Sequence, residues 1–113
     1  MRQRVMGKDW ERFQGVYPAL VTPFDVEGRV DEDVLRDLVD WHLKAGVRGS
    51  FVCGSTGEGL LLSTEERKRV AEVVVDHLSG RGLCIVHVGH PSSEESTRLA
   101  RHAEEIGADT TAP

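Results

Sequence analysis

The chain has 113 residues, enough for one small domain with a modest core and too few for several domains. A hydrophobic content of 39% and a charged content of 29% are typical of a folded soluble protein and not of a disordered one. The net charge of −5 and the aromatic content of 5% argue against a nucleic-acid partner, which would need clustered cations or stacking aromatic side chains. No apolar stretch approaches the roughly 20 residues of a membrane span, so we expect no membrane partner.

The first residues and the cysteines indicate a cytoplasmic protein. Residues 1–12 carry charge of both signs and have no apolar core, unlike a signal peptide. Cys53 and Cys84 both lie in apolar runs, and buried reduced thiols are the favoured interpretation; a disulfide is an alternative that nothing requires. We interpret residues 1–14 as a polar lead-in and residues 15–113 as one domain.

The first predicted element is a strand over residues 15–21, followed by a turn at residues 25–28. Pro18 cannot donate a ladder hydrogen bond, so we expect this strand at an edge or at the start of a sheet. A helix follows, because Asp31 is a good N-cap and Gly46 is a good stop. Its apolar stripe at helical spacing consists of Val34, Leu35, Leu38, Val39, Trp41, His42 and Leu43.

Strands and helices then alternate along the chain. The pattern predicts a strand over residues 49–53, a helix over about 64–78, a strand over 83–88, a helix over 92–106 and the start of a fourth strand over 108–113. Both complete strands are continuous apolar runs, typical of strands covered on both faces. The alternation predicts an α/β fold with a parallel sheet.

Both of these later helices begin at a predicted capping box. Ser63 pairs with Glu66 in the first, and Ser92 pairs with Glu95 in the second. The buried stripe of the first helix is predicted to be Val70, Ala71, Val73, Val74 and Leu78. Its charged run, residues 65–69, is interpreted as solvated outer surface. The helical histidines are also expected at the surface: His42, His77 and His102.

Polar and glycine residues gather where the predicted strands end, which is where functional groups lie in parallel α/β folds. Three stretches stand there: Thr22-Pro23-Phe24, Gly54-Ser55-Thr56-Gly57-Glu58-Gly59 and His87-Val88-Gly89-His90. The central stretch combines glycines with two hydroxyls, which suits a carboxylate or phosphate held by backbone N–H and hydroxyl groups. Glycine-rich turns are also often no more than turns, so that alternative stays open.

The glycine loop matches neither common phosphate motif. A P-loop needs Lys and then Ser or Thr after its last glycine, whereas Leu60 follows Gly59 here. The spacing G-x-x-G-x-G also differs from the dinucleotide fingerprint. His87 and His90 could share a metal in principle, but no acidic third ligand is adjacent, so we expect no metal, a packed His87 and an exposed His90.

Three motifs carry more information together than any one of them alone. They are residues 15–24 (GVYPALVTPF), residues 54–58 (GSTGE) and residues 87–89 (HVG). Their order and spacing resemble the dihydrodipicolinate synthase / N-acetylneuraminate lyase family of class I pyruvate-type aldolases. The resemblance covers about residues 13–113. The Ser-Thr pair and the HVG motif look more like the lyase branch, because the synthase branch more often has two threonines.

The resemblance implies a (β/α)8 TIM barrel, of which this chain would be the N-terminal part. A whole barrel needs eight strand–helix units and about 250 residues. We therefore expect about three βα units and the start of a fourth strand. An open partial barrel would expose strand edges and apolar faces, which predicts self-association or poor solubility.

The resemblance also implies a Schiff-base lyase or synthase that acts on pyruvate or another 2-oxo acid, with no cofactor. In such enzymes a lysine forms a Schiff base with the keto carbon and acts as an electron sink. Carried onto this chain, Gly54, Ser55 and Thr56 hold the substrate carboxylate, and Ala19 and Thr22 line the pocket floor. The Ser55 hydroxyl falls where the family places a catalytic proton relay. Glu58 is either an acid or base or a cap of local amides.

One feature departs from the family pattern. The family's Schiff-base lysine lies on the sixth strand, and its catalytic tyrosine lies just beyond the fourth. The lysines of this chain are Lys8, Lys44 and Lys68, and its one tyrosine is Tyr17. None matches those places, so we expect the 113 residues alone to be inactive. The expected partners are a 2-oxo acid and, since the family is usually oligomeric, further copies of the chain. The alternative is a non-catalytic α/β module for anion binding or assembly.

Overall fold

The computed structural model describes residues 10–113, so the expected lead-in lies mostly outside the described part. The elements are α2 (Glu32–Lys44), β1 (Gly49–Val52), the short 3-10 helix η1 (Gly59–Leu61), α3 (Thr64–Leu78), β2 (Leu83–His87), α4 (Ser93–Glu105) and β3 (Thr110–Ala112). This order confirms the predicted alternation, including the start of a fourth strand at β3. In the described part of the chain, none of the helices is both long and apolar enough to cross a bilayer.

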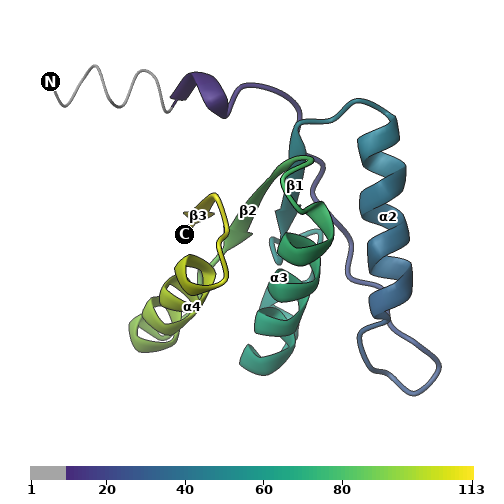
Figure 1. Ribbon diagram of the computed structural model, residues 1–113. Coiled ribbons are helices and arrows are strands. Elements are labelled where there is room, and N and C mark those ends of the chain that lie inside the picture. Colours follow the sequence, from purple (N-terminus) through teal and green to yellow (C-terminus); the bar gives the residue numbers. More distant parts are fainter. Residues whose placement is uncertain (1–9) are drawn as a thin grey trace, which may run out of the picture.

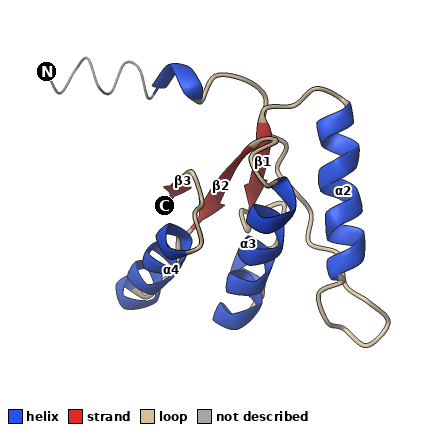
Figure 2. Cartoon of the chain, in the orientation of Figure 1, coloured by secondary structure: helices blue, strands red, loops and turns tan. Residues whose placement is uncertain are grey.

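The three strands form one parallel sheet in the order β1-β2-β3. Phe51 of β1 lies opposite Ile85 of β2, which lies opposite Thr110 of β3. The helices lie side by side along this sheet, with α3 in contact with both α2 and α4 (Figure 1). β1 and β2 are each followed by a helix, α3 and α4 respectively, that returns the chain to the next strand (Figure 2). The fold class is therefore α/β with a parallel sheet, as predicted.

The segment predicted as the first strand, residues 15–21, runs beside β1 without becoming a regular strand. Its only bridge among the described residues pairs Ala19 with Phe51. There the Phe51 N–H donates to the Pro18 carbonyl (3.0 Å), and the Leu20 N–H donates to the Phe51 carbonyl (2.9 Å). The preceding ladder bond would need an N–H on Pro18, which proline lacks. The expected position at the start of the sheet is right, but regular strand pairing there is wrong.

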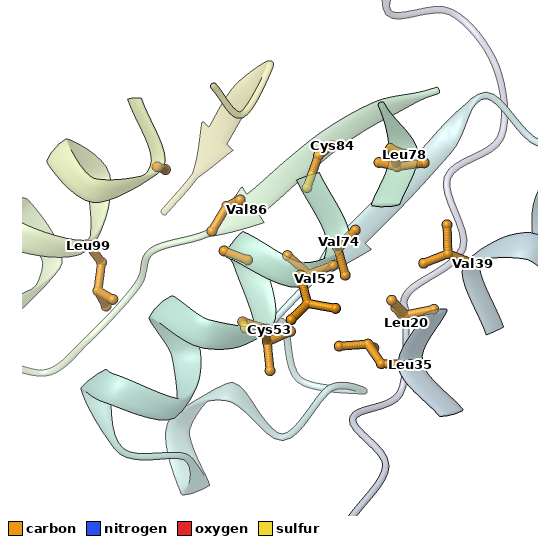
Figure 3. Close-up of a cluster of buried hydrophobic side chains, with 14 of the residues drawn as sticks. Leu20, Leu35, Val39, Val52, Cys53, Val74, Leu78, Cys84, Val86 and Leu99 are labelled. Atoms are coloured by element: carbon orange, nitrogen blue, oxygen red, sulfur yellow. The ribbon is translucent and has the colours of Figure 1, made fainter. Parts of the chain in front are cut away.

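A single hydrophobic core lies between the sheet and the helices (Figure 3). Its buried members include Leu20, Leu35, Val39, Val52, Cys53, Val70, Val74, Leu78, Cys84, Val86, Leu99 and Ala103. All five residues of the predicted α3 stripe are buried, as expected. Both cysteines are free and buried, as predicted, and burial raises the pKa of Cys53 to about 11 and that of Cys84 to about 12.

The helices cover one face of the sheet, and this corrects two predictions. In β2 the burial alternates, with Cys84 and Val86 buried and Ile85 and its neighbours on the other face half-buried. Coverage of both faces is therefore wrong for the described chain. The stripe of α2 is also narrower than predicted, because Trp41 is 68% exposed and Val34 is 42% exposed. The main neighbour of α2 is α3, which contacts only one side of it.

The helix caps follow the prediction in α3 and depart from it in α4. Ser63 and Glu66 form both bonds of the capping box. Ser92 accepts from the Glu95 N–H (3.3 Å), but the Ser92 N–H donates to His90 Nδ1 (2.9 Å). The Glu95 carboxylate accepts instead from the Thr64 hydroxyl (3.0 Å) at the beginning of α3. A tertiary contact thus replaces one bond of the predicted box.

Polar pairs join neighbouring helices across their outer faces. Arg69 of α3 donates two hydrogen bonds to Glu32 of α2, each 2.7 Å long. His102 of α4 lies 2.8 Å from Glu72 of α3. The hydrogen bond from Arg69 lowers the pKa of Glu32, and the hydrogen bond from His102 lowers the pKa of Glu72. His102, which was expected at the surface, is therefore a tie between helices, and its side chain is only 14% exposed.

These pKa shifts predict acid destabilisation. A carboxyl whose pKa is lower in the folded state contributes stability above its unfolded pKa and loses that stability as pH falls through its folded pKa. We expect the melting temperature to fall between about pH 5 and pH 3, and to fall less steeply in the variant Glu32→Gln/Glu72→Gln. Circular dichroism melts across this range measure it, with Glu105→Gln on the exposed face of α4 as control. Equal pH slopes in the double variant and the unaltered chain would contradict the prediction.

Candidate functional site

The glycine loop lies at the carboxyl end of β1, between the sheet and η1. Its two left-handed residues are Cys53 (φ 62°) and Glu58 (φ 57°), neither of which is glycine. A non-glycine residue in this conformation costs on the order of 1–2 kcal/mol, and such strain is characteristic of functional loops. The backbone of the loop is therefore held in shape by contacts outside the two residues themselves.

The glycines of this loop are required by close packing and not by positive φ. A Cβ at Gly59 would overlap the Cys53 carbonyl, and one at Gly54 would overlap the Phe51 ring. A Cβ at Gly57 would lie 2.8 Å from the Leu20 carbonyl oxygen. The loop is thus folded tightly against β1 and against the segment that runs beside it.

Two backbone carbonyls of the loop point inward. The Gly54 carbonyl accepts from the Gly59 N–H (3.0 Å), and the Ser55 carbonyl accepts from the Glu58 N–H (3.0 Å). In a trans peptide the next N–H points the opposite way, so the N–H groups of Ser55 and Thr56 face outward. Within residues 10–113 neither of them donates to a protein atom. Adjacent outward N–H groups of this kind form a site for an anion.

The predicted site residues do not all meet in one pocket. Ser55 and Thr56 are exposed, and Gly54 is buried beneath them. A pocket of about 340 Å³ lies beside the loop, lined by Gly54, Ser55, Glu58, Gly59, Leu60, Leu61 and His87. It joins the loop to η1 and to the end of β2. Thr56 lies next to this pocket in the chain without lining it.

Thr22 and Ala19 lie on the segment that runs beside β1. The Thr22 hydroxyl donates to the Gly57 carbonyl (2.7 Å), so Thr22 holds the loop against this segment. Ala19 is exposed and pairs with Phe51. Neither residue lines the pocket beside Ser55 in the described part of the chain. Their established contacts are with the backbone that supports the loop.

Arg67 is the residue that sequence reasoning missed. The run 65–69 was expected to be solvated, yet Arg67 is only 2% exposed. Its Nη1 donates to the Gly89 carbonyl and its Nη2 to the His87 carbonyl, both at 2.8 Å. Burial lowers its pKa. Helical spacing could have predicted this burial, because Arg67 precedes Val70 and Val74 by three and seven residues and so shares their buried face.

His87 is packed and His90 is exposed, as predicted. His87 Nδ1 lies 2.9 Å from the Cys53 carbonyl oxygen, and its ring lies 6.3 Å from the Phe51 ring between centroids. His90 Nδ1 accepts from the Ser92 N–H. One nitrogen of each ring therefore already has a protein partner, and the expectation that the two share no metal stays a prediction.

Relatives of known activity match most of this chain. The Dihydrodipicolinate synthetase family matches residues 12–112. The N-acetylneuraminate lyase of Citrobacter koseri is 43% identical over 104 residues, which are 92% of this chain and 34% of that protein. The 4-hydroxy-tetrahydrodipicolinate synthase of Jannaschia sp. is 44% identical over 99 residues, or 88% of this chain and 34% of that protein. The chain thus spans about a third of the length of these relatives.

Solved structures agree with these relatives. The N-acetylneuraminate lyase from Mycoplasma synoviae aligns with 90% of this chain and 35% of its own, at a TM-score of 0.85 and 36% identity. YagE from E. coli K12 aligns with 88% of this chain and 33% of its own, also at 0.85 and 36%. These neighbours are TIM barrels, so the three-stranded sheet corresponds to part of a barrel. The chain belongs to the dihydrodipicolinate synthetase family, whose members are lyases and synthases of this aldolase type.

Proposed function

We propose that this chain carries the carboxylate-binding part of a Schiff-base lyase or synthase that acts on pyruvate or a related 2-oxo acid. The observation that carries the proposal is the pair of outward N–H groups at Ser55 and Thr56. The relatives support it, and the YagE structure is described as a complex with pyruvate. The loop holds the same place at the carboxyl end of a strand that barrel enzymes use for their ligands.

The donor set of the loop suits a carboxylate. Ser55 and Thr56 each offer one N–H and one hydroxyl, all at the surface, and a carboxylate has two oxygens to accept them. Hydrogen bonds to an ionised acceptor are stronger than neutral ones. In this proposal the Ser55 hydroxyl also relays a proton, and Gly54 supplies the buried backbone beneath the donors. Thr22 acts through its bond to the Gly57 carbonyl, and Ala19 through the sheet.

We further propose that these 113 residues bind the 2-oxo acid without turning it over. Schiff-base chemistry needs an amine at the keto carbon. Lys44 is the last residue of α2, and Lys68 lies on α3 with its ammonium 3.8 Å from Glu65. Neither lines the pocket beside Ser55, and Lys8 lies outside the described residues. In the whole protein the lysine would come from another unit of the barrel.

A homo-oligomer and a cytoplasmic location complete the proposal. The half-buried sheet face around Phe51 and Ile85 favours self-association. Two free buried cysteines favour a reducing compartment. We propose no nucleic-acid, membrane or metal partner.

Pyruvate binding at the loop can be measured on the chain itself. We expect a pyruvate titration followed by ¹H–¹⁵N NMR to shift the amide signals of Ser55 and Thr56. Ser55→Ala and Thr56→Val should each weaken binding roughly tenfold or more, because each removes a hydroxyl that donates to a charged oxygen. Glu58→Gln is the matched control, since Glu58 lines the same pocket but its side chain supplies none of the proposed donors, and binding should stay equal or tighten. Shifts confined to other residues would favour the alternative of a module without this ligand.

Borohydride trapping tests the absence of turnover. Incubation of the chain with pyruvate and sodium borohydride should leave its intact mass unchanged, because neither lysine of the described residues, Lys44 or Lys68, lines the proposed site. A full-length N-acetylneuraminate lyase treated in parallel should gain the mass of the reduced adduct. An adduct on Lys44, Lys68 or Lys8 of this chain would show that the proposal of binding without chemistry is wrong.

A further inference from the structure

The end of β2 is held by one buried side chain. Arg67 of α3 donates to the carbonyls of His87 and Gly89, both at 2.8 Å. These carbonyls lie two residues apart, so the guanidinium fixes both ends of the His-Val-Gly stretch at once. A forked donor with little exposure loses less entropy per bond than a flexible ammonium would. The position of His87 is therefore set from the helix side.

The surroundings of His87 determine which ring nitrogen carries the proton. Its Nδ1 lies 2.9 Å from the Cys53 carbonyl oxygen, which can only accept. Nδ1 is therefore protonated and donates to Cys53. The same Nδ1 lies 3.3 Å from Arg67 Nη2, which is also a donor, so that approach is not a hydrogen bond. Gly89 leaves room for the ring, because a Cβ there would lie 2.7 Å from Nε2.

The contact from His87 reaches Cys53, the residue directly before the glycine loop (residues 54–59). Cys53 is left-handed (φ 62°), and its carbonyl shares a peptide plane with the Gly54 N–H. Fixing that carbonyl fixes the first peptide of the loop. The next two carbonyls are fixed by the amides of Gly59 and Glu58. The outward direction of the Ser55 and Thr56 amides thus depends on three successive carbonyl contacts, of which only the first comes from another strand.

We propose that Arg67 and His87 are positioning residues of the carboxylate site. Arg67 holds His87, and the Nδ1–H of His87 holds the Cys53 carbonyl in the conformation that turns the Ser55 and Thr56 amides toward the ligand. This inference rests on the proposed function of the loop. It also applies to the chain before pyruvate is added, because the contact between His87 and Cys53 involves protein atoms only.

Two substitutions of His87 distinguish the role of its N–H donor from the role of its aromatic ring. His87→Asn keeps an N–H donor close to the place of Nδ1, while His87→Phe keeps an aromatic ring beside Phe51 and removes the donor. Arg67→Met removes the two donors to β2, and Arg69→Met is the matched control. Arg69 stands on the same helix, but it is exposed and binds Glu32.

We expect ¹⁵N NMR of the unaltered chain to show His87 protonated at Nδ1. In His87→Phe the amide signals of Gly54, Ser55 and Thr56 should shift and exchange faster with solvent even without ligand, and pyruvate affinity should fall roughly tenfold. His87→Asn should keep affinity within about threefold of the unaltered chain. Arg67→Met should reproduce the His87→Phe changes, and Arg69→Met should change neither signals nor affinity.

Different outcomes would overturn the positioning role of His87 and the proposed function of the loop. Loop signals in His87→Phe that match the unaltered chain would overturn the positioning role, and so would equal losses in His87→Phe and His87→Asn. Absence of pyruvate binding by the unaltered chain would overturn the proposed function, whereas the ligand-free loop signals would still decide what His87 does to Cys53. If Arg67→Met does not fold, the two His87 variants decide the inference, since that side chain is only half-buried.

Discussion

The carboxyl end of the sheet depends on one buried guanidinium. Arg67 brings a positive charge into the core side of α3, where its Nη1 and Nη2 donate to the carbonyls of Gly89 and His87 at the end of β2, while its buried Nε has no partner among the described residues. Without these two carbonyls the whole buried guanidinium would be unpaired, at a cost of several kcal/mol, so the strand end must stay where the carbonyls can accept. Helix, strand and loop are thereby tied together at the end of the sheet where the exposed residues Ser55 and Thr56 lie.

Local signals predicted the elements, and tertiary contacts account for the exceptions. The capping box at Ser63 and the stripe of α3 follow from spacing alone, and both are present. The box at Ser92 is half formed because Glu95 finds Thr64 of the neighbouring helix, a contact across 31 residues of chain. Arg67 was misread because its charge outweighed its spacing. A charged side chain can be buried where backbone carbonyls accept its hydrogen bonds. These carbonyls are distant in the sequence, so a single sequence does not reveal them.

The glycine loop was found by composition, but its glycines serve a different purpose from the one that composition suggests. They allow the backbone to press against Cys53, Leu20 and Phe51, while the left-handed residues are Cys53 and Glu58. Sequence reasoning thus identifies Ser55 and Thr56 as the proposed carboxylate ligands and misses the contacts that shape the loop around them. The missing part is the 2.9 Å contact between His87 Nδ1 and the Cys53 carbonyl oxygen, which joins residues 34 positions apart.

In the glycine loop, two of the four donors proposed for the carboxylate are backbone N–H groups, so their direction is a local property of this loop. Its amides are oriented by contacts with β1, β2 and α3, all within one stretch of the chain that spans about a third of the relatives' length. A Schiff-base lysine does not depend on these backbone contacts, and it can lie on any strand whose carboxyl end faces the same ligand. Under the proposed function, recognition of the acid and attack on its carbonyl would therefore be separable in this fold. A substitution of His87 should weaken binding of the acid without altering the groups that attack its carbonyl.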